Sequence, residues 1–178
     1  MRNSRRIRVS IVIPTFERPE YLPLAIESAL WQEESSREIF VISDADPGAR
    51  AIAEQFPGVR YIELEEHGDL AGCMNRGIAE ARGEYLMMLQ DDDLALPCKA
   101  TALADWLDEH REYAAVCSLS EAIDGDGAPH KESAKRLARY RRWGLARITR
   151  EKMTEINIID QPTVLYRTGA LRAVGGFE

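Results

Sequence analysis

The sequence predicts an α/β domain with a largely parallel central sheet. Short apolar, β-branched runs are typical of strands buried on both faces, and amphipathic segments between them are typical of helices. Strands that alternate with helices at this spacing form a parallel sheet covered by helices. Polar residues directly follow several of the predicted strands. Because ligands bind outside the carboxyl ends of such strands, these polar residues are the first candidates for a functional site.

The elements follow from the spacing of apolar residues, which is continuous or alternating in strands and recurs every three to four residues in helices. Asp46 and Asp69 occupy N-cap positions, and Gly83 is expected to close the helix that follows Asp69. The predicted elements are a strand 9–13 ended by Pro14, a helix 22–30, a strand 39–42, a helix from Pro47 to about Phe56, a strand 59–64, a helix 70–81, a strand 85–89, a helix 96–110 and a strand 114–119.

The composition fits one folded domain of 178 residues, with 45% hydrophobic and 30% charged residues. No apolar run reaches the roughly 18 residues that a membrane helix needs, and the apolar run after the basic N-terminus is too short for a signal peptide. We therefore expect a cytoplasmic protein. Its three cysteines, Cys73, Cys98 and Cys117, are widely spaced and suit reduced, mostly buried thiols.

A basic insertion, partly helical, is predicted over about 130–155, after a hairpin turn at Asp124–Gly127. Between Lys135 and Lys152 eight Lys or Arg residues accompany one acid, giving +7; since the whole chain carries −7, the remainder sums to −14. One interpretation is a solvated helix that pairs with the acidic body. The other is contact with an anionic membrane surface, a polyprenyl-phosphate acceptor or a phosphorylated glycan. The net charge argues against nucleic-acid binding.

Three carboxylates, Asp91, Asp92 and Asp93, directly follow the predicted strand 85–89. Neighbouring carboxylates repel one another, so a cation that offsets their charge is favoured. Mg²⁺ and Mn²⁺ prefer carboxylate oxygens and bind through one or two of them together with substrate phosphates. The alternative is a solvated acidic turn in which Asp93 caps the next helix. The position at the end of a central strand favours the metal site.

Two other strand ends carry candidate binding residues. Asp44 can accept a hydrogen bond from a base N–H or a ribose hydroxyl, although a turn or helix-capping role is equally common. Thr15 and Glu17 give a weaker signal, because a polar residue after a strand can simply face water. Neither G-x-G-x-x-G after the first strand nor G-x-x-x-x-G-K-[ST] occurs, which disfavours a dehydrogenase or a P-loop phosphotransferase.

Several segments together resemble the family 2 glycosyltransferases with the GT-A fold. The matching segments are Val9–Leu22, Glu38–Asp44, Asn75–Ile78, Gly83–Pro97, Gln161–Arg167 and Val174–Glu178. They cover most of the chain in the family's order and spacing. The resemblance implies one GT-A domain over residues 1–178, a Rossmann-like three-layer sandwich. It also implies a nucleoside-diphosphate sugar as donor, most often a UDP-sugar, and a divalent metal, Mn²⁺ or Mg²⁺.

The resemblance also assigns roles to individual residues. The implied donor-binding residues are Pro14, Thr15, Phe16, Glu17, Asp44, Asn75 and Asp91, and the implied metal ligands are Asp92, Asp91 and Asp93. Asp44 would hydrogen-bond the base, and Asp92 would be the direct metal ligand. The chain departs from the family pattern at four positions: Gln90 replaces the first Asp of an Asp-x-Asp motif, Ser43 a common Asp, Glu17 a common Asn and Met74 a common Arg.

By resemblance the reaction is an inverting transfer to a hydroxyl acceptor, a glycan or a lipid-linked molecule, in the synthesis of cell-envelope polysaccharide, lipopolysaccharide or glycoconjugate. Peripheral contact with the inner face of the membrane through Lys135–Lys152 would fit this role. The family's catalytic base usually lies shortly beyond the Gly-Gly-Phe segment, so we expect it beyond Glu178. We therefore expect this chain to bind the donor but to transfer little sugar. The alternatives are a nucleotide-binding module without catalysis and a sugar nucleotidyltransferase, which normally has a glycine-rich basic loop where Pro14–Arg18 stands.

Overall fold

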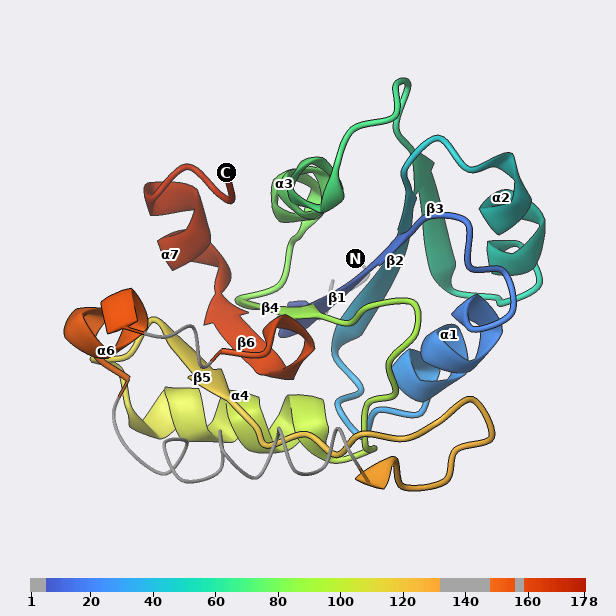
Figure 1. The fold of residues 1–178 in the computed structure, drawn as a ribbon. Helices are drawn as coiled ribbons and strands as arrows, with labels where there is room; N and C mark the ends of the chain where they lie inside the picture. Colours follow the sequence, from blue (N-terminus) through green and yellow to red (C-terminus); the bar gives the residue numbers. More distant parts are fainter. Residues whose placement is uncertain (1–5, 132–147, 156–158) are drawn as a thin grey trace.

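The computed structural model describes residues 6–131, 148–155 and 159–178, and in them a central sheet lies between two layers of helices (Figure 1). Its six strands are ordered β3-β2-β1-β4-β6-β5. The strands are β1 (Val9–Thr15), β2 (Arg37–Ser43), β3 (Val59–Glu63), β4 (Tyr85–Met88), β5 (Ala115–Cys117) and β6 (Val164–Arg167). β1 to β4 pair in parallel, and β6 is antiparallel to both of its neighbours. The predicted α/β class with a largely parallel sheet is confirmed.

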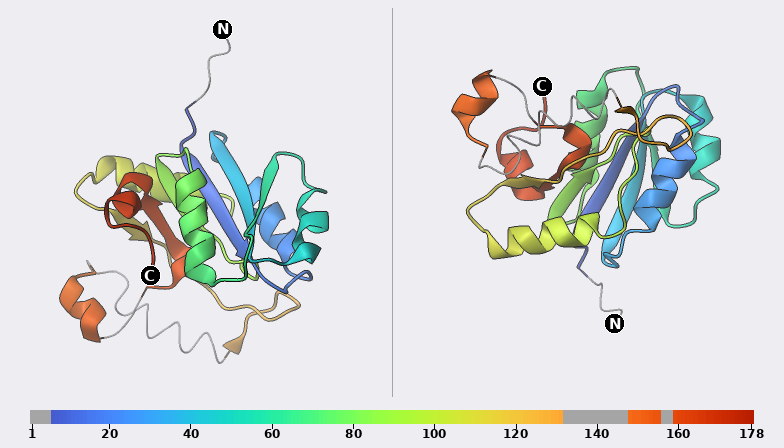
Figure 2. Two further views of the ribbon diagram at one scale, coloured as in Figure 1. Left: turned by 90° about the horizontal axis from the view of Figure 1, so that it is seen from above. Right: turned by 60° about the horizontal axis from the view of Figure 1, so that its bottom comes forward.

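Helices cover both faces of the sheet, as Figures 1 and 2 show. The helices are α1 (Leu22–Leu30), α2 (Pro47–Ala53), α3 (Leu70–Glu80), α4 (Lys99–Glu109), α6 (Arg150–Glu155) and α7 (Thr168–Ala173), with a 3-10 turn η1 (Gln161–Thr163). α1, α2 and α4 pack with Ile11 and Ile13 of β1, whereas α3 and α7 pack with Val12. Successive side chains of a strand point to opposite faces, so the continuous apolar run of β1 fills two cores.

β1 is longer than predicted, because Pro14 does not end it. Pro14 pairs in register with Ile42 of β2, and the ladder continues through the Thr15 carbonyl, which accepts a hydrogen bond from the Asp44 N–H at 3.1 Å. A proline lacks only the backbone N–H, so it removes one donor from the strand, and the neighbouring residues can still form their hydrogen bonds. The strand therefore carries Thr15 to the edge of the sheet, and Phe16 directly follows it.

Both predicted N-caps are confirmed. The Asp46 carboxylate accepts from the Gly48 N–H at 2.9 Å, and the Asp69 carboxylate accepts from the Gly72 N–H at 2.8 Å. Gly83, in contrast, does not close α3, which ends at Glu80. A Cβ atom at Gly83 would lie 2.6 Å from the Ser10 backbone nitrogen. The glycine thus permits a close approach to β1.

Around α4 one prediction needs correction, and the hairpin predicted after it is confirmed. α4 begins at Lys99 with Cys98 at its N-cap, so Asp93 does not cap it, because a turn and loop separate the two. The hairpin at Asp124–Gly127 is confirmed, since the Asp124 N–H donates to the Ala128 carbonyl at 2.8 Å.

Most of the predicted basic helix lies outside the described residues, which resume at residue 148. The proposed membrane contact through Lys135–Lys152 therefore stays a prediction. Within the described ranges, each helix is too short or too polar to cross a membrane. All three cysteines are free thiols, with Cys73 buried and Cys98 exposed.

Charged side chains pair closely at the amino-terminal ends of the central strands. The Arg8 guanidinium, just before β1, donates to Glu34 at 3.0 Å and to Asp105 and Asp108 of α4 at 2.6 Å each. We call these residues, with the Glu38 group described next, the amino-end network. It joins the strand ends to α4 and to the loop before β2.

Glu38, at the start of β2, is the buried acid of the amino-end network. It accepts from the Ser10 hydroxyl at 2.7 Å, from the Arg82 backbone N–H at 2.7 Å and from the Arg82 guanidinium at 2.8 Å. Burial raises the pKa of Glu38, but these hydrogen bonds together outweigh it and leave the pKa below its ordinary value. The ionised Glu38 therefore stabilises the fold.

Candidate functional site

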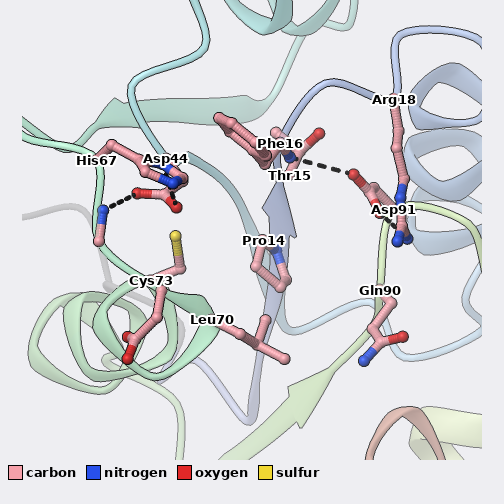
Figure 3. A pocket seen from close by; sticks show the side chains of 12 residues that line it. Pro14, Thr15, Phe16, Arg18, Asp44, His67, Leu70, Cys73, Gln90 and Asp91 are labelled. Carbon is pink, nitrogen blue, oxygen red and sulfur yellow. Dashed lines mark hydrogen bonds and ion pairs between the residues drawn. The ribbon is translucent and has the colours of Figure 1, made fainter.

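A pocket opens at the carboxyl ends of β1, β2 and β4, with a volume of about 280 Å³ (Figure 3). We call it the strand-end pocket. Its lining residues are Pro14, Thr15, Phe16, Arg18, Asp44, His67, Gly68, Asp69, Leu70, Cys73, Gln90 and Asp91. This is the edge of a parallel sheet at which ligands bind. The structure therefore brings together five of the predicted donor-binding residues: Pro14, Thr15, Phe16, Asp44 and Asp91.

Two aromatic rings form one wall of the strand-end pocket. The ring centroids of Phe16 and His67 lie 4.5 Å apart with an interplanar angle of 31°. Phe16 is 39% exposed and the His67 side chain is 59% exposed. Both rings are therefore accessible to a ligand in the pocket. The pair offers a flat surface on which a planar ring can stack.

Asp44 holds His67 in place from behind. One Asp44 oxygen lies 3.0 Å from His67 Nδ1, and the other accepts from the Gly68 N–H at 2.8 Å. Asp44 itself is buried. Figure 3 shows this pair on one side of the end of β1. A carboxylate that accepts the Nδ1 proton fixes the tautomer of the ring and leaves Nε2 as an acceptor.

On the other side of the end of β1, Arg18 lies between two carboxylates. Its guanidinium is 3.2 Å from Asp91 and 2.6 Å from Asp92, and the Phe16 N–H donates to Asp91 at 3.4 Å. Burial, the largest effect, raises the pKa of Asp91 in spite of the charge of Arg18. Asp91 is buried, whereas Arg18 is about half exposed. The charged partner of this buried carboxylate is thus a solvent-facing cation.

The donor set of this pair fits a divalent metal. Asp91 and Asp92 already share one cationic group, the Arg18 guanidinium, so both carboxylates face a common position. Among the described residues, none of His, Cys, Asp and Glu gather in groups of three or more that could hold a metal ion. Mg²⁺ commonly uses only one or two protein carboxylates and completes its shell with phosphates and water. The pair Asp91 and Asp92 meets that requirement.

Asp93 is separated from the other two carboxylates. It lines a different cavity together with Lys99, whose positive charge partly offsets that of the carboxylate. Burial, followed by the charges of Asp92 and Asp160, raises the pKa of Asp93 to about 6. The three consecutive aspartates therefore lie in two different environments. A metal-ligand role for Asp93 stays a prediction, which the geometry does not support.

Two predicted donor-binding residues, Glu17 and Asn75, lie outside the lining of the strand-end pocket. The Glu17 N–H donates to the Asp46 carboxylate at 3.1 Å, and the backbone of Glu17 has a φ of 52°. The Asn75 amide donates to the Phe177 carbonyl and accepts from the Phe177 N–H, both at 2.8 Å. Asn75 thus fastens the segment that contains Gly176 and Phe177 to α3.

The lining also includes residues that the sequence did not indicate as binding residues. Arg18 and His67 are the most important, followed by Leu70, Cys73 and Gln90. Arg18 follows the first strand by only three residues. A positive charge at this strand end could have been expected to pair with the aspartates at the end of the neighbouring strand. His67 lies in a loop without apolar periodicity, so its position depends on the distant Asp44.

The sequence matches a known family over most of its length. Residues 10–175 match the family model "Glycosyl transferase family 2". The succinoglycan biosynthesis protein ExoO of Rhizobium meliloti is 30% identical over 122 residues, which cover 67% of this chain and 35% of ExoO. The putative glycosyltransferase EpsE of Bacillus subtilis is 27% identical over 115 residues, covering 61% of this chain and 41% of EpsE. The chain thus spans less than half the length of these relatives.

Solved structures share the fold. The mannosyltransferase PcManGT from Pyrobaculum calidifontis, in complex with GDP-Man and Mn²⁺, aligns with a TM-score of 0.71 at 18% identity, covering 98% of this chain and 48% of that one. S. aureus TarS 1-349 in complex with UDP aligns with a TM-score of 0.67 at 17% identity, covering 94% and 48%. The family match and the fold agree with the resemblance seen in the sequence, and the chain belongs to glycosyl transferase family 2.

Proposed function

We propose that this chain is the donor-binding part of a glycosyltransferase and that the strand-end pocket takes the nucleotide of a nucleoside-diphosphate sugar. The observation that carries the proposal is the arrangement of the aromatic pair Phe16 and His67 between two buried carboxylates, Asp44 and Asp91. A base stacks on aromatic rings, and carboxylates accept hydrogen bonds from ribose hydroxyls. The nucleotide and nucleotide-sugar complexes of PcManGT and TarS support this role.

In this proposal His67 contacts the base and Asp44 positions it. Asp44 already accepts hydrogen bonds at both oxygens, and in the neutral tautomer that donates Nδ1–H to Asp44 the His67 Nε2 is left as an acceptor for the base. Uracil and guanine both carry ring N–H groups that can donate to Nε2. The volume of about 280 Å³ lies just below the usual range of ligand pockets, which favours the smaller uracil and hence a UDP-sugar.

Asp91 and Asp92 would hold the divalent metal, Mn²⁺ or Mg²⁺, in the position that the Arg18 guanidinium takes in the free protein. A bound metal supplies Lewis-acid stabilisation of the leaving diphosphate. The protein's own part is to present two fixed carboxylates and a planar aromatic wall. Arg18, released from the carboxylates, is long enough and exposed enough to pair with a phosphate oxygen.

The wider activity extends the same proposal. The transfer is inverting, to a hydroxyl of a glycan or a lipid-linked acceptor, in the synthesis of a cell-envelope polysaccharide, lipopolysaccharide or glycoconjugate. The relative named for succinoglycan biosynthesis supports glycan synthesis.

Calorimetric titration of UDP, GDP, ADP and CMP tests the donor site, with Mn²⁺, with Mg²⁺ and with chelator. We expect one nucleotide to bind in a metal-dependent way. Asp92→Ala removes an exposed carboxylate and should weaken this binding on the order of 100-fold. Asp126→Ala, in the exposed hairpin, is the matched control and should bind as the parent does. Failure of every nucleotide to bind folded protein would overturn the proposal.

A further inference from the structure

A second cavity lies beside the strand-end pocket, between the segment after β4, α4 and the chain that follows β5. Its volume is about 550 Å³, within the range of roughly 300–1,000 Å³ that is usual for small-molecule sites. Its walls are mainly apolar, and we call it the apolar cavity. The apolar side chains that define it are Leu89, Leu94, Leu96, Leu103, Leu119 and Ile123.

The exposure of these side chains is the first argument that the cavity binds a ligand. Among the described residues ten large hydrophobic side chains are exposed, and four of them line the apolar cavity. They are Leu94 (53%), Leu96 (74%), Leu119 (53%) and Ile123 (45%). Single exposed apolar residues are common, but several gathered around one hollow mark a binding site. The sheet and its two cores do not account for them, since the cores are formed by other residues.

The position of the cavity is the second argument. Gln90 and Asp91 line the strand-end pocket, while Leu89 and Asp93 line the apolar cavity. The two sites therefore flank one short segment at the end of β4. A molecule in the apolar cavity therefore contacts the same short segment that carries the proposed metal ligands Asp91 and Asp92. This is where the second substrate of a transfer reaction has to be.

The charged groups of the cavity restrict the chemistry of its ligand. Asp93 and Glu121 contribute carboxylates to the lining, and Lys99 contributes one amino group, which donates to the Pro162 carbonyl. Asp160, which is not part of the lining, acts on the charge of Lys99 and accepts from the Ser120 hydroxyl at 3.1 Å. Because the Lys99 amino group is already engaged by a carbonyl and Asp93 presents a carboxylate, the described lining disfavours an anionic head group. Hydroxyl groups, which can donate to carboxylates, suit it better.

We propose that the apolar cavity binds the acceptor, an uncharged amphiphile whose alkyl or isoprenoid chain fills the hollow and whose hydroxyl-bearing end faces Asp93. This inference rests on the proposed donor site for its functional meaning, but the binding itself does not require a nucleotide. The expected acceptor is a neutral lipid-linked glycoside. A polyprenyl phosphate would differ from it in carrying a charge, and a free sugar would lack the apolar chain.

The test is a chain-length series of alkyl β-D-glucosides, titrated below their micelle-forming concentrations without nucleotide or metal. Each methylene that enters an apolar site should raise the affinity about fourfold. We therefore expect affinity to rise from methyl through hexyl to octyl glucoside, with octyl glucoside binding more tightly than octyl phosphate. An affinity that does not depend on chain length, or tighter binding of octyl phosphate, would overturn the proposal.

Ala102 offers a variant that fills the cavity without disturbing the core, because it is exposed on α4 and lines the hollow. Ala102→Trp should weaken octyl glucoside binding at least tenfold. Ala51→Trp, at an exposed position of α2, is the matched control and should have no effect. Leu119→Ser is a second variant at an exposed position, so the test does not depend on one substitution. Unchanged affinity in both folded cavity variants would place the alkyl chain elsewhere.

The same samples are then titrated with the nucleotides and Mn²⁺, which separates the two proposals. Alkyl glucoside binding without nucleotide binding would leave the apolar cavity in place and overturn the donor site. Nucleotide binding without alkyl glucoside binding would do the reverse. If both ligands bind, they should bind together, because they occupy opposite sides of the segment Gln90–Asp93; mutual exclusion would contradict two adjacent sites.

Discussion

At the amino-terminal ends of β1, β2 and β4, charged side chains are satisfied by one another, whereas at the carboxyl-terminal ends of the same strands they surround an open pocket. Arg8 contacts three carboxylates, and Glu38 accepts hydrogen bonds from Ser10 and Arg82. At the opposite edge the buried Asp91 depends on a half-exposed Arg18. Both regions are rich in charge, and they differ in how far the partner cation is exposed: the Arg8 side chain is 26% exposed and the Arg18 side chain 48%.

The amino-terminal ends of these strands are therefore expected to contribute mainly to stability, and the carboxyl-terminal ends mainly to binding. A buried charge with complete partners is costly to disturb, while a buried charge with an incomplete set of partners is open to a ligand. Substitutions in the amino-end network should therefore lower the free energy of unfolding and leave nucleotide binding intact. Substitutions in the strand-end pocket should do the opposite.

The largest expected effect is that of Asp91→Asn, which keeps the shape of the side chain and removes its charge. The affinity for the nucleotide with its metal should fall on the order of 100-fold. The free energy of unfolding at neutral pH should rise, because burial makes the ionised form of Asp91 unfavourable. Calorimetry and urea denaturation measure the two quantities. Asp105→Asn, in the amino-end network, is the control and should retain full nucleotide affinity.

Glu38→Gln should have the next largest effect, a loss of about 2 kcal/mol in the free energy of unfolding at neutral pH, with unchanged nucleotide binding. The pKa of Glu38 is lowered in the fold, so its contribution is present above its ordinary value of 4.5 and is lost as the pH falls through the folded value. Urea denaturation at neutral and acidic pH should show the parent and the variant converging in acid. A difference that stays constant with pH would contradict this role.

A smaller effect is expected at the aromatic wall. Removing one stacking ring costs about 1–3 kcal/mol of binding, so His67→Ala should weaken nucleotide affinity about tenfold. His67→Phe keeps the ring but loses Nε2 and should recover only part of the affinity. His110→Ala is the control, because His110 stacks on Trp106 of α4 instead. Equal affinities of the Phe variant and the parent would remove the hydrogen bond to the base from the proposal.

The smallest effect should come from relieving backbone strain beside the strand-end pocket. Glu17 adopts a φ of 52°, a left-handed conformation that Asn tolerates better than Glu. Glu17→Asn should therefore raise the free energy of unfolding by about 1 kcal/mol without changing nucleotide affinity. Glu20→Asn, at an exposed position without this conformation, is the control in thermal melting. A stabilisation of both variants alike would point to a cause other than strain.

The elements set by local patterns could be predicted from the sequence. The apolar run of β1 and the caps Asp46 and Asp69 follow from residues within one turn or one strand. The strand-end rule of parallel sheets also placed Phe16, Asp44 and Asp91 together, although they lie up to 75 residues apart.

What could not be predicted depends on contacts between distant side chains. His67 acquires its position from Asp44, and Asp93 lines a different cavity from the one that Asp91 lines. Asn75 was expected at the donor, yet its amide is engaged 102 residues later in the chain by Phe177. Periodicity carries no information on such pairs, because each depends on packing that both partners share.

The contact between Asn75 and the C-terminal turn also bears on how the sequence can vary. Gly176 has a φ of 92°, and a Cβ atom there would overlap the Asn75 side-chain oxygen. The Asn-Arg-Gly and Gly-Gly-Phe segments, which look like two separate motifs, are therefore one structural unit. Residues 75 and 176 should change together or not at all, so among homologues they should co-vary as a pair. A chain that keeps one without the other would need a different way to hold its C-terminal turn against α3.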